Sequence, residues 1–253
     1  MKSILLLIIF FAGLIIISCN QSPLKKPYNK VKLDTLDSQQ LIVVTTNDWN
    51  DFKGKFYCYE KENKKWELIL SDSCVVGRNG LGIGLGIKTF QFPDAPIKIE
   101  GDLKSPAGIF KIGNAFGYAN KKEVSWLKVP YIESTNDLLC IDDGNSLSYN
   151  QFVYSDTKKK DWNSCEKMHL KNYLYKWGLF VEHNPTRIPG KGSCIFIHIW
   201  ESNNKGTTGC TAMSEDNILK ILHWIDVKKK PLLVQFPKRE YEKVLEKIEL
   251  PKI

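Results

Sequence analysis

The feature that most constrains the fold is a series of short runs of β-branched and aromatic residues, each followed by a turn-forming cluster. The first four runs are QLIVVTT (40–46), KFYCYEK (55–61), WELIL (66–70) and SCVVG (73–77). The clusters between them include Asn47-Asp48 and Glu62-Asn63-Lys64, which are typical of turns between strands. This order predicts a meander of antiparallel strands within a mainly β fold, with a few helices packed on a mixed sheet or sandwich.

Further elements are predicted downstream. The additional strands are GLFVEHN (178–184), SCIFIHIW (193–200) and PLLVQFP (231–237). A helix is expected after Ser214, a good N-cap, because two acidic residues suit its first turn and apolar residues then recur at helical spacing. Segment 161–177 also places apolar residues near helical spacing, so its His169 is expected on a helix rather than in a site.

The N-terminus has the pattern of an export and lipidation signal. Residues 4–17 are uncharged and apolar, a run shorter than the about 20 residues of a spanning helix. Cys19 follows in a context that resembles a bacterial lipobox, in which the cysteine thiol is alkylated by a diacylglyceryl group. We expect a lipoprotein signal peptide (1–18), a solvated tether (19–39), and a protein that is lipid-anchored to a bacterial membrane and faces the cell wall in the periplasm. An ordinary cleaved signal and an uncleaved anchor are the alternatives.

The length and the net charge of the chain limit its possible domain organisation and partners. The 253 residues suit one domain, expected over 40–237, and the charged tail (238–253) is expected to form an exposed helix. The formal net charge of +8 favours an anionic partner, but no basic run interleaved with aromatic residues indicates nucleic acid. The glycine-rich run RNGLGIGLGI lacks the GxGxxG spacing of a nucleotide site and is interpreted as a turn and strand. We expect a monomer.

Export also places the later cysteines where disulfides can form. These are Cys58, Cys74, Cys140, Cys165, Cys194 and Cys210. If Cys210 stays free, five remain and one of them has no partner. Spacing does not fix the connectivity, and a bridge between Cys140 and Cys165 is only a guess.

One histidine and one cysteine flank the loop ESNNKG. Because strand side chains alternate, Ile195, Ile197 and Ile199 share one face and His198 points away from it. If the loop folds back, His198 and Cys210 meet at one end of a sheet. A cysteine beside an imidazole is ionised near neutral pH, and the imidazole can then protonate a leaving amine, which is the chemistry of acyl transfer.

Neighbouring residues are candidates for binding the substrate and the oxyanion. Gly209 permits a strained turn, and the backbone N–H groups around it are potential oxyanion donors. The other candidates are Thr207, Thr208, Thr211, Trp200 and His183. Core packing is the alternative for Trp200, and a structural role is the alternative for His183.

The stretch from His198 to Cys210 resembles the signature of the L,D-transpeptidase catalytic domain (YkuD) family, in which a histidine precedes a [Ser/Thr]-x-Gly-Cys element, here residues 207–210. The segments VVGRNGLG, GDLKSPAGIFKIGNAFGY and PLLVQFP are similar to a lipoprotein-type subgroup. The resemblance implies a YkuD-like β-sandwich or mixed sheet. It also implies that Cys210 attacks the diamino-acid carbonyl of a peptidoglycan stem peptide and expels D-alanine, with His198 as general base and acid.

The acceptor is left open by the resemblance. An amine completes transpeptidation, whereas water gives an L,D-carboxypeptidase, and a wall-binding lipoprotein without catalysis is the distant alternative. The usual histidine before Gly-Cys is Thr208 and the arginine often found two residues after the cysteine is Ala212. The cations that could replace that arginine are Arg187, Lys104 and Arg78. No HExxH or paired CxxC motif occurs, so neither a metal nor a cofactor is expected.

Overall fold

The computed structural model describes residues 38–156 and 159–253, so the expected signal peptide and the expected lipidation site at Cys19 lie outside it. The strands are β1 (Gln40–Thr46), β2 (Lys53–Glu62), β3 (Lys65–Val75), β4 (Leu81–Ile83), β5 (Ser105–Gly117), β6 (Tyr131–Glu133), β7 (Leu138–Cys140), β8 (Phe152–Tyr154), β9 (Glu166–Lys167), β10 (Trp177–Val181), β11 (Phe196–Ile199), β12 (Thr211–Met213) and β13 (Leu232–Pro237). The helices are α1 (Glu215–Trp224), the 3₁₀ turn η2 (Val227–Lys229) and α2 (Lys238–Leu245).

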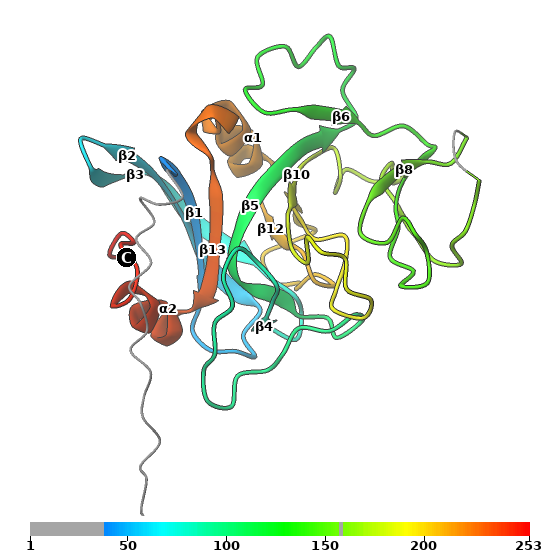
Figure 1. Cartoon of the computed structure of the whole chain (residues 1–253). Coiled ribbons are helices and arrows are strands. Elements are labelled where there is room, and N and C mark those ends of the chain that lie inside the picture. The colour runs from blue at the N-terminus through cyan, green and yellow to red at the C-terminus, as the bar shows by residue number, and fades with distance from the viewer. Residues whose placement is uncertain (1–37, 157–158) are drawn as a thin grey trace, which may run out of the picture.

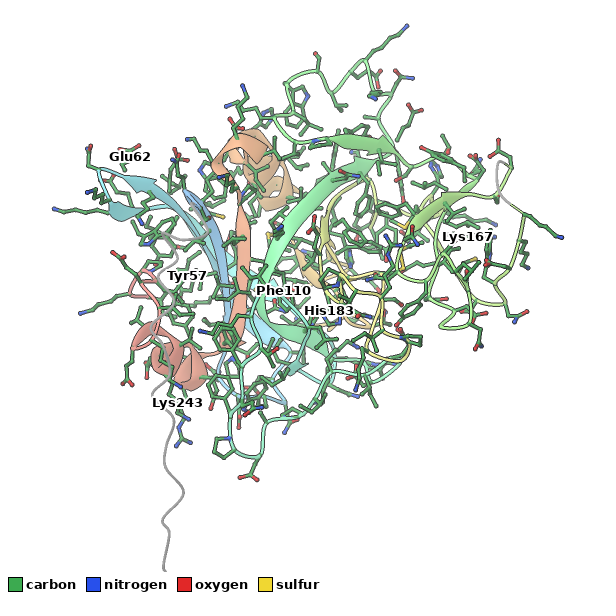
Figure 2. The ribbon with its side chains drawn as sticks, viewed as in Figure 1. Tyr57, Glu62, Phe110, Lys167, His183 and Lys243 are labelled. Carbon is green, nitrogen blue, oxygen red and sulfur yellow. A yellow bond between two sulfur atoms is a disulfide. The ribbon has the colours of Figure 1, made fainter. Side chains whose placement is uncertain are left out.

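The strands β1, β2 and β3 form the predicted antiparallel meander. Residues 66–70 and 73–77 were expected as two strands, but most of this stretch is one strand, β3. The polar residues 71–73 do not interrupt it, because they pair with β2 while their side chains stay exposed to solvent. The hairpin that ends at Glu62 projects from the body of the molecule (Figure 2).

The main sheet is mixed and curves until it closes. Its order is β10-β11-β12-β3-β2-β1-β13-β5-β4, and the pairs β1–β13 and β11–β12 are parallel. Because β10 also pairs with β5, the path from β10 to β5 returns to its own start. Figure 1 shows β5 sweeping across the molecule between β13 and β10. The predicted mainly β, mixed-sheet fold is confirmed.

A second sheet, of order β8-β7-β9, is inserted between β6 and β10. Figure 2 shows Lys167, in β9, on the side of the molecule opposite Glu62. The helix expected over 161–177 is therefore wrong, since this segment contains β9 and a series of turns. Pairing of β9 with β7 supplies backbone hydrogen bonds that a short helix would otherwise provide, so tertiary context overrides the weak helical pattern.

A disulfide joins this inserted sheet to the main sheet. It links Cys140 to Cys194, with 6.0 Å between the Cα atoms and a sequence separation of 54 residues. The suggested Cys140–Cys165 bridge is wrong, and Cys165 is free. Glu166 pairs directly with Cys140 across β7 and β9, so the side chain of Cys165 points to the opposite face. Closing a loop of this length stabilises the fold by roughly 4 kcal/mol.

Two hydrophobic clusters lie on opposite faces of the strand that carries His198. Ile195, Ile197 and Ile199 belong to the main core, as the alternating pattern predicted. Phe196 belongs to a second cluster, which we call the outer cluster. Its other buried members are Phe116, Leu138, Cys140, Met168, Tyr175, Cys194 and Cys210.

Helix α1 forms as predicted, with the Ser214 side chain accepting the Asn217 N–H at its N-cap. The tail forms the predicted helix over 238–245, but this helix is not exposed throughout. Tyr241 and Val244 are fully buried against the main core, and the Tyr241 hydroxyl donates to the Pro251 carbonyl at 2.7 Å. Among the described residues, no helix combines the length and the apolar character needed to cross a bilayer.

The buried tail gives a stability prediction. Tyr241→Ala removes a fully buried ring and should lower the free energy of unfolding by about 3–5 kcal/mol. The matched control Tyr173→Ala removes a ring that is 49% exposed, and should change the free energy of unfolding by less than about 0.5 kcal/mol. Urea denaturation measures both variants. Equal effects of the two substitutions would contradict the packed tail.

Candidate active site

The parallel pairing of β11 and β12 sets the position of the two predicted catalytic residues. His198 lies opposite Ala212, and the same register places Cys210 beside Phe196. The Phe196 N–H accordingly donates to Cys210 Sγ at 3.3 Å. Since paired residues share a face of the sheet, His198 and Cys210 lie on one face of neighbouring strands. The loop 201–206 therefore brings them together as expected, through a parallel crossover.

The Cys210 thiol is buried in the outer cluster. Besides the Phe196 contact, Sγ donates to the Cys194 carbonyl at 3.7 Å. Burial raises the pKa of the Cys210 thiol far above its usual range, and the nearby Glu166 charge raises it further. The thiol is thus protonated in the ligand-free protein.

The His198 imidazole is also buried and neutral. Its Nδ1 is hydrogen-bonded to the Ile199 carbonyl at 2.8 Å, and the Tyr175 ring packs edge-on with 5.0 Å between ring centroids. Burial lowers the pKa of His198 to about 4. A neutral imidazole is the form that can accept a proton from a thiol.

No hydrogen bond joins the His198 imidazole to Cys210 Sγ among the residues that the structure describes. Hydrogen bonds between catalytic groups are often long or misaligned without substrate and shorten in the substrate complex. The arrangement is therefore that of a resting pair, which lies on one face but is not yet in direct contact.

A cleft of about 390 Å³ opens over His198. Its walls include Trp200, Thr207 and Thr208, three of the predicted binding residues. Arg78 and Lys205 also line it. Lys205 is paired with Glu201 at 2.6 Å, whereas no ion pair within the described ranges involves Arg78. Arg78 is thus a cation at the cleft that forms no ion pair with the part of the chain that the structure describes.

The turn before Cys210 is held by hydroxyl groups. The φ angle of Gly209 is 156°, a conformation that favours glycine. The Gly209 N–H, an expected oxyanion donor, donates to Thr207 Oγ1 at 3.1 Å in the ligand-free protein. The Thr207 and Ser105 hydroxyls both donate to the Cys210 carbonyl, at 2.5 and 2.9 Å. These bonds fix the backbone on which the sulfur is carried.

Thr211 does not present its side chain to the cleft. It follows Cys210 in the strand, so its side chain points to the other face, where its hydroxyl donates to the buried Gln235 Oε1 at 2.7 Å. The candidate role of Thr211 as a binding side chain therefore lacks the required geometry. Its position on β12 still supports the backbone next to Cys210.

His183 lies away from His198. Gly178 is the β10 residue opposite His198, whereas His183 is five residues further along the chain, beyond the end of β10. Its Nδ1 accepts the Leu85 N–H at 3.3 Å and its Nε2 is bonded to the Lys191 carbonyl at 2.9 Å. Both ring nitrogens of His183 are therefore engaged by backbone groups, away from the cleft over His198.

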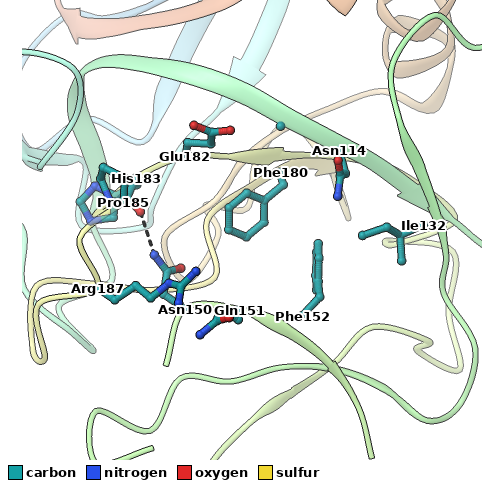
Figure 3. A pocket seen from close by; sticks show the side chains of 11 residues that line it. Asn114, Ile132, Asn150, Gln151, Phe152, Phe180, Glu182, His183, Pro185 and Arg187 are labelled. Carbon is teal, nitrogen blue, oxygen red and sulfur yellow. Dashed lines mark hydrogen bonds between the residues drawn. The ribbon is translucent and has the colours of Figure 1, made fainter. Parts of the chain in front are cut away.

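A second cleft, of about 490 Å³, lies beside His183 (Figure 3). The Asn150 side chain donates to the His183 carbonyl at 2.8 Å across its floor. Arg187 lines this second cleft rather than the one over His198. Lys104 donates to Asn50 and Asn79. Of the three cations suggested from the sequence, Arg78 is the one that lines the His198 cleft.

Sequence reasoning missed Glu166 and Tyr175, which both line the cleft over His198. The Tyr175 hydroxyl donates to Glu166 Oε1. Burial raises the pKa of the Glu166 carboxyl to about 7. Both residues come from the segment expected to be a helix, and no local pattern marks either as functional. The described residues contain no group of three or more His, Cys, Asp or Glu side chains that could hold a metal ion.

Comparison with protein families matches residues 53–234 to the L,D-transpeptidase catalytic domain (YkuD). A search of curated proteins found no match. Among solved structures, the chain is similar to Bd1075 of Bdellovibrio bacteriovorus, with 13% identity and a TM-score of 0.40. That similarity covers 85% of this chain and 55% of the Bdellovibrio chain. At this TM-score it supports no inference about fold or activity.

The buried thiol gives a reactivity prediction. In the folded, ligand-free protein at pH 7.5, iodoacetamide should alkylate Cys210 at least about tenfold more slowly than the partly exposed Cys165, because a raised pKa leaves little thiolate. Timed quenching and peptide mass spectrometry measure both rates in one sample. Faster alkylation of Cys210 than of Cys165 would contradict the buried resting state.

Proposed function

Because the chain belongs to the L,D-transpeptidase catalytic domain (YkuD) family, we propose that it is a cysteine-dependent acyltransferase that acts on peptidoglycan stem peptides. The observation that carries this proposal is the placement of Cys210 and His198 on one face of neighbouring strands, with the cleft opening over His198. The family acts on peptidoglycan peptides.

The first half-reaction forms a thioester. His198 takes the proton of the Cys210 thiol, and the sulfur attacks a carbonyl carbon of the stem peptide. The carbon–nitrogen bond to the terminal D-alanine then breaks, and the His198 imidazolium protonates the leaving amine. Burial keeps both groups neutral in the free protein, so no ion pair holds them together. Substrate entry must therefore bring the imidazole and the sulfur into contact.

The second half-reaction transfers the acyl group to an amine acceptor, which gives a new peptide bond and regenerates the thiol. Hydrolysis by water is the second candidate outcome, and it uses the same thioester. Hydrolysis is a candidate because a buried carboxyl group, that of Glu166, lines the cleft. The acceptor therefore decides between a transpeptidase and an L,D-carboxypeptidase.

The acyl-enzyme is directly testable. The parent protein incubated with a tetrapeptide donor should gain the mass of the donor less D-alanine, because the thioester retains the acyl part. Cys210→Ala should gain no mass, and Cys58→Ala, which changes a buried free cysteine of the main core, should behave as the parent does. Intact-protein mass spectrometry reads all three. A mass gain in Cys210→Ala would refute the proposed nucleophile.

We also propose that the protein is exported and held at a bacterial membrane through a lipid on Cys19, facing the cell wall. The support is the apolar run 4–17 followed by a cysteine in a lipobox-like context. Several acyl chains on one cysteine anchor a protein stably, since each buried CH₂ contributes about 0.8 kcal/mol.

Lipidation can be measured by metabolic labelling with an alkyne fatty acid in a bacterial host that processes lipoproteins. The parent chain should carry the label and fractionate with membranes, because the modified thiol is that of Cys19. Cys19→Ala should lose both properties, whereas Cys165→Ala should keep them. Labelling of Cys19→Ala at the parent level would contradict the anchor.

A further inference from the structure

Glu166 is held at the active site by the inserted sheet. It pairs with Cys140 across β7 and β9, and Cys140 is bridged to Cys194. The Cys194 carbonyl in turn accepts the S–H of Cys210. One disulfide therefore fixes both the strand that carries the carboxyl group and the backbone that contacts the sulfur.

The Glu166 carboxyl group is connected to the His198 imidazole through the side chain of Tyr175. The buried Tyr175 donates its hydroxyl to Glu166, and its ring packs edge-on against the His198 imidazole. Glu166, Tyr175 and His198 all line the same cleft. The charge of the Glu166 carboxylate also acts on the Cys210 thiol, whose pKa it raises.

Stability does not account for a carboxyl group in this position. Burial disfavours its charged form, and within the described part of the chain no ion pair involves Glu166. Buried ionisable groups that line a cleft are candidates for functional roles. The titratable and charged groups around Glu166 are Tyr175, Asp142, Cys210, His198, Arg78, Glu201 and Lys205.

We propose that Glu166 is a further catalytic residue, the general base that takes a proton from the acceptor as the acceptor attacks the acylated Cys210. The inference rests on the proposed function, because it needs the thioester. It assigns the two half-reactions to two groups: His198 serves the thiol and the leaving amine, and Glu166 serves the incoming amine or water.

The step balances in atoms and charge. The acceptor's lone pair forms a bond to the thioester carbonyl carbon, and one acceptor proton moves to the Glu166 carboxylate. The carbon–sulfur bond breaks and Cys210 leaves as a thiolate. Glu166 then returns the proton, which ends on the Cys210 sulfur. A carboxyl group with a pKa of about 7 suits this work, since general bases are most effective when their pKa lies near the working pH.

The first test separates acylation from decay of the acyl-enzyme. In Glu166→Gln, a tetrapeptide donor should acylate Cys210 at close to the parent rate, but decay to water or to an added amine should slow by about 100-fold. The matched control is Glu100→Gln, because Glu100 accepts the Tyr149 hydroxyl at 2.5 Å in a similar pair that does not line this cleft. Parent-like decay in Glu166→Gln would overturn the inference.

The second test uses the pH dependence of decay. The Tyr175 hydrogen bond lowers the pKa of Glu166, so Tyr175→Phe should raise that pKa and move the acidic limb of the decay profile to higher pH. An unmoved limb would overturn the inference, even if Glu166→Gln failed to fold. If the parent forms no acyl-enzyme at all, the proposed function itself fails, so the two failures are distinguishable.

Discussion

The parallel pairing of β11 with β12 is the constraint on which the rest of the site depends. Strand residues alternate between faces, so this one register places Cys210 beside Phe196 and on the same face as His198. A slip of one residue would turn either side chain into the main core. The hydroxyls of Thr207 and Ser105 hold the turn before the sulfur, which fixes that register at its start.

The outer cluster determines the protonation states of the site. It surrounds the thiol with apolar side chains, and the inserted sheet is attached to it by the Cys140–Cys194 disulfide. Charged forms are disfavoured in such surroundings, so the thiol is protonated, the imidazole is neutral, and the carboxyl group ionises only as the pH rises through about 7. The thiol and the imidazole are therefore both neutral before substrate binds, and no ion pair between them has to be broken in the first step.

The sequence predicted those features that local periodicity controls. Alternation put the isoleucines of β11 in the core and His198 outside it, and the N-cap at Ser214 marked the start of α1. The pairing of residues that are distant in the chain could not be predicted from the sequence. Spacing could not distinguish Cys165 from Cys194 as the partner of Cys140, and the helical pattern over 161–177 concealed β9. Glu166 was missed because its environment comes from segments distant in the chain.

The central claim is that the neutral imidazole of His198 activates the sulfur of Cys210. It is tested most directly by the rate constant for acylation by a tetrapeptide donor in His198→Gln, measured by rapid quenching and mass spectrometry. The account predicts a loss of about 100-fold or more, with folding and the Cys140–Cys194 disulfide retained. Acylation at the parent rate in a folded His198→Gln protein would contradict the account.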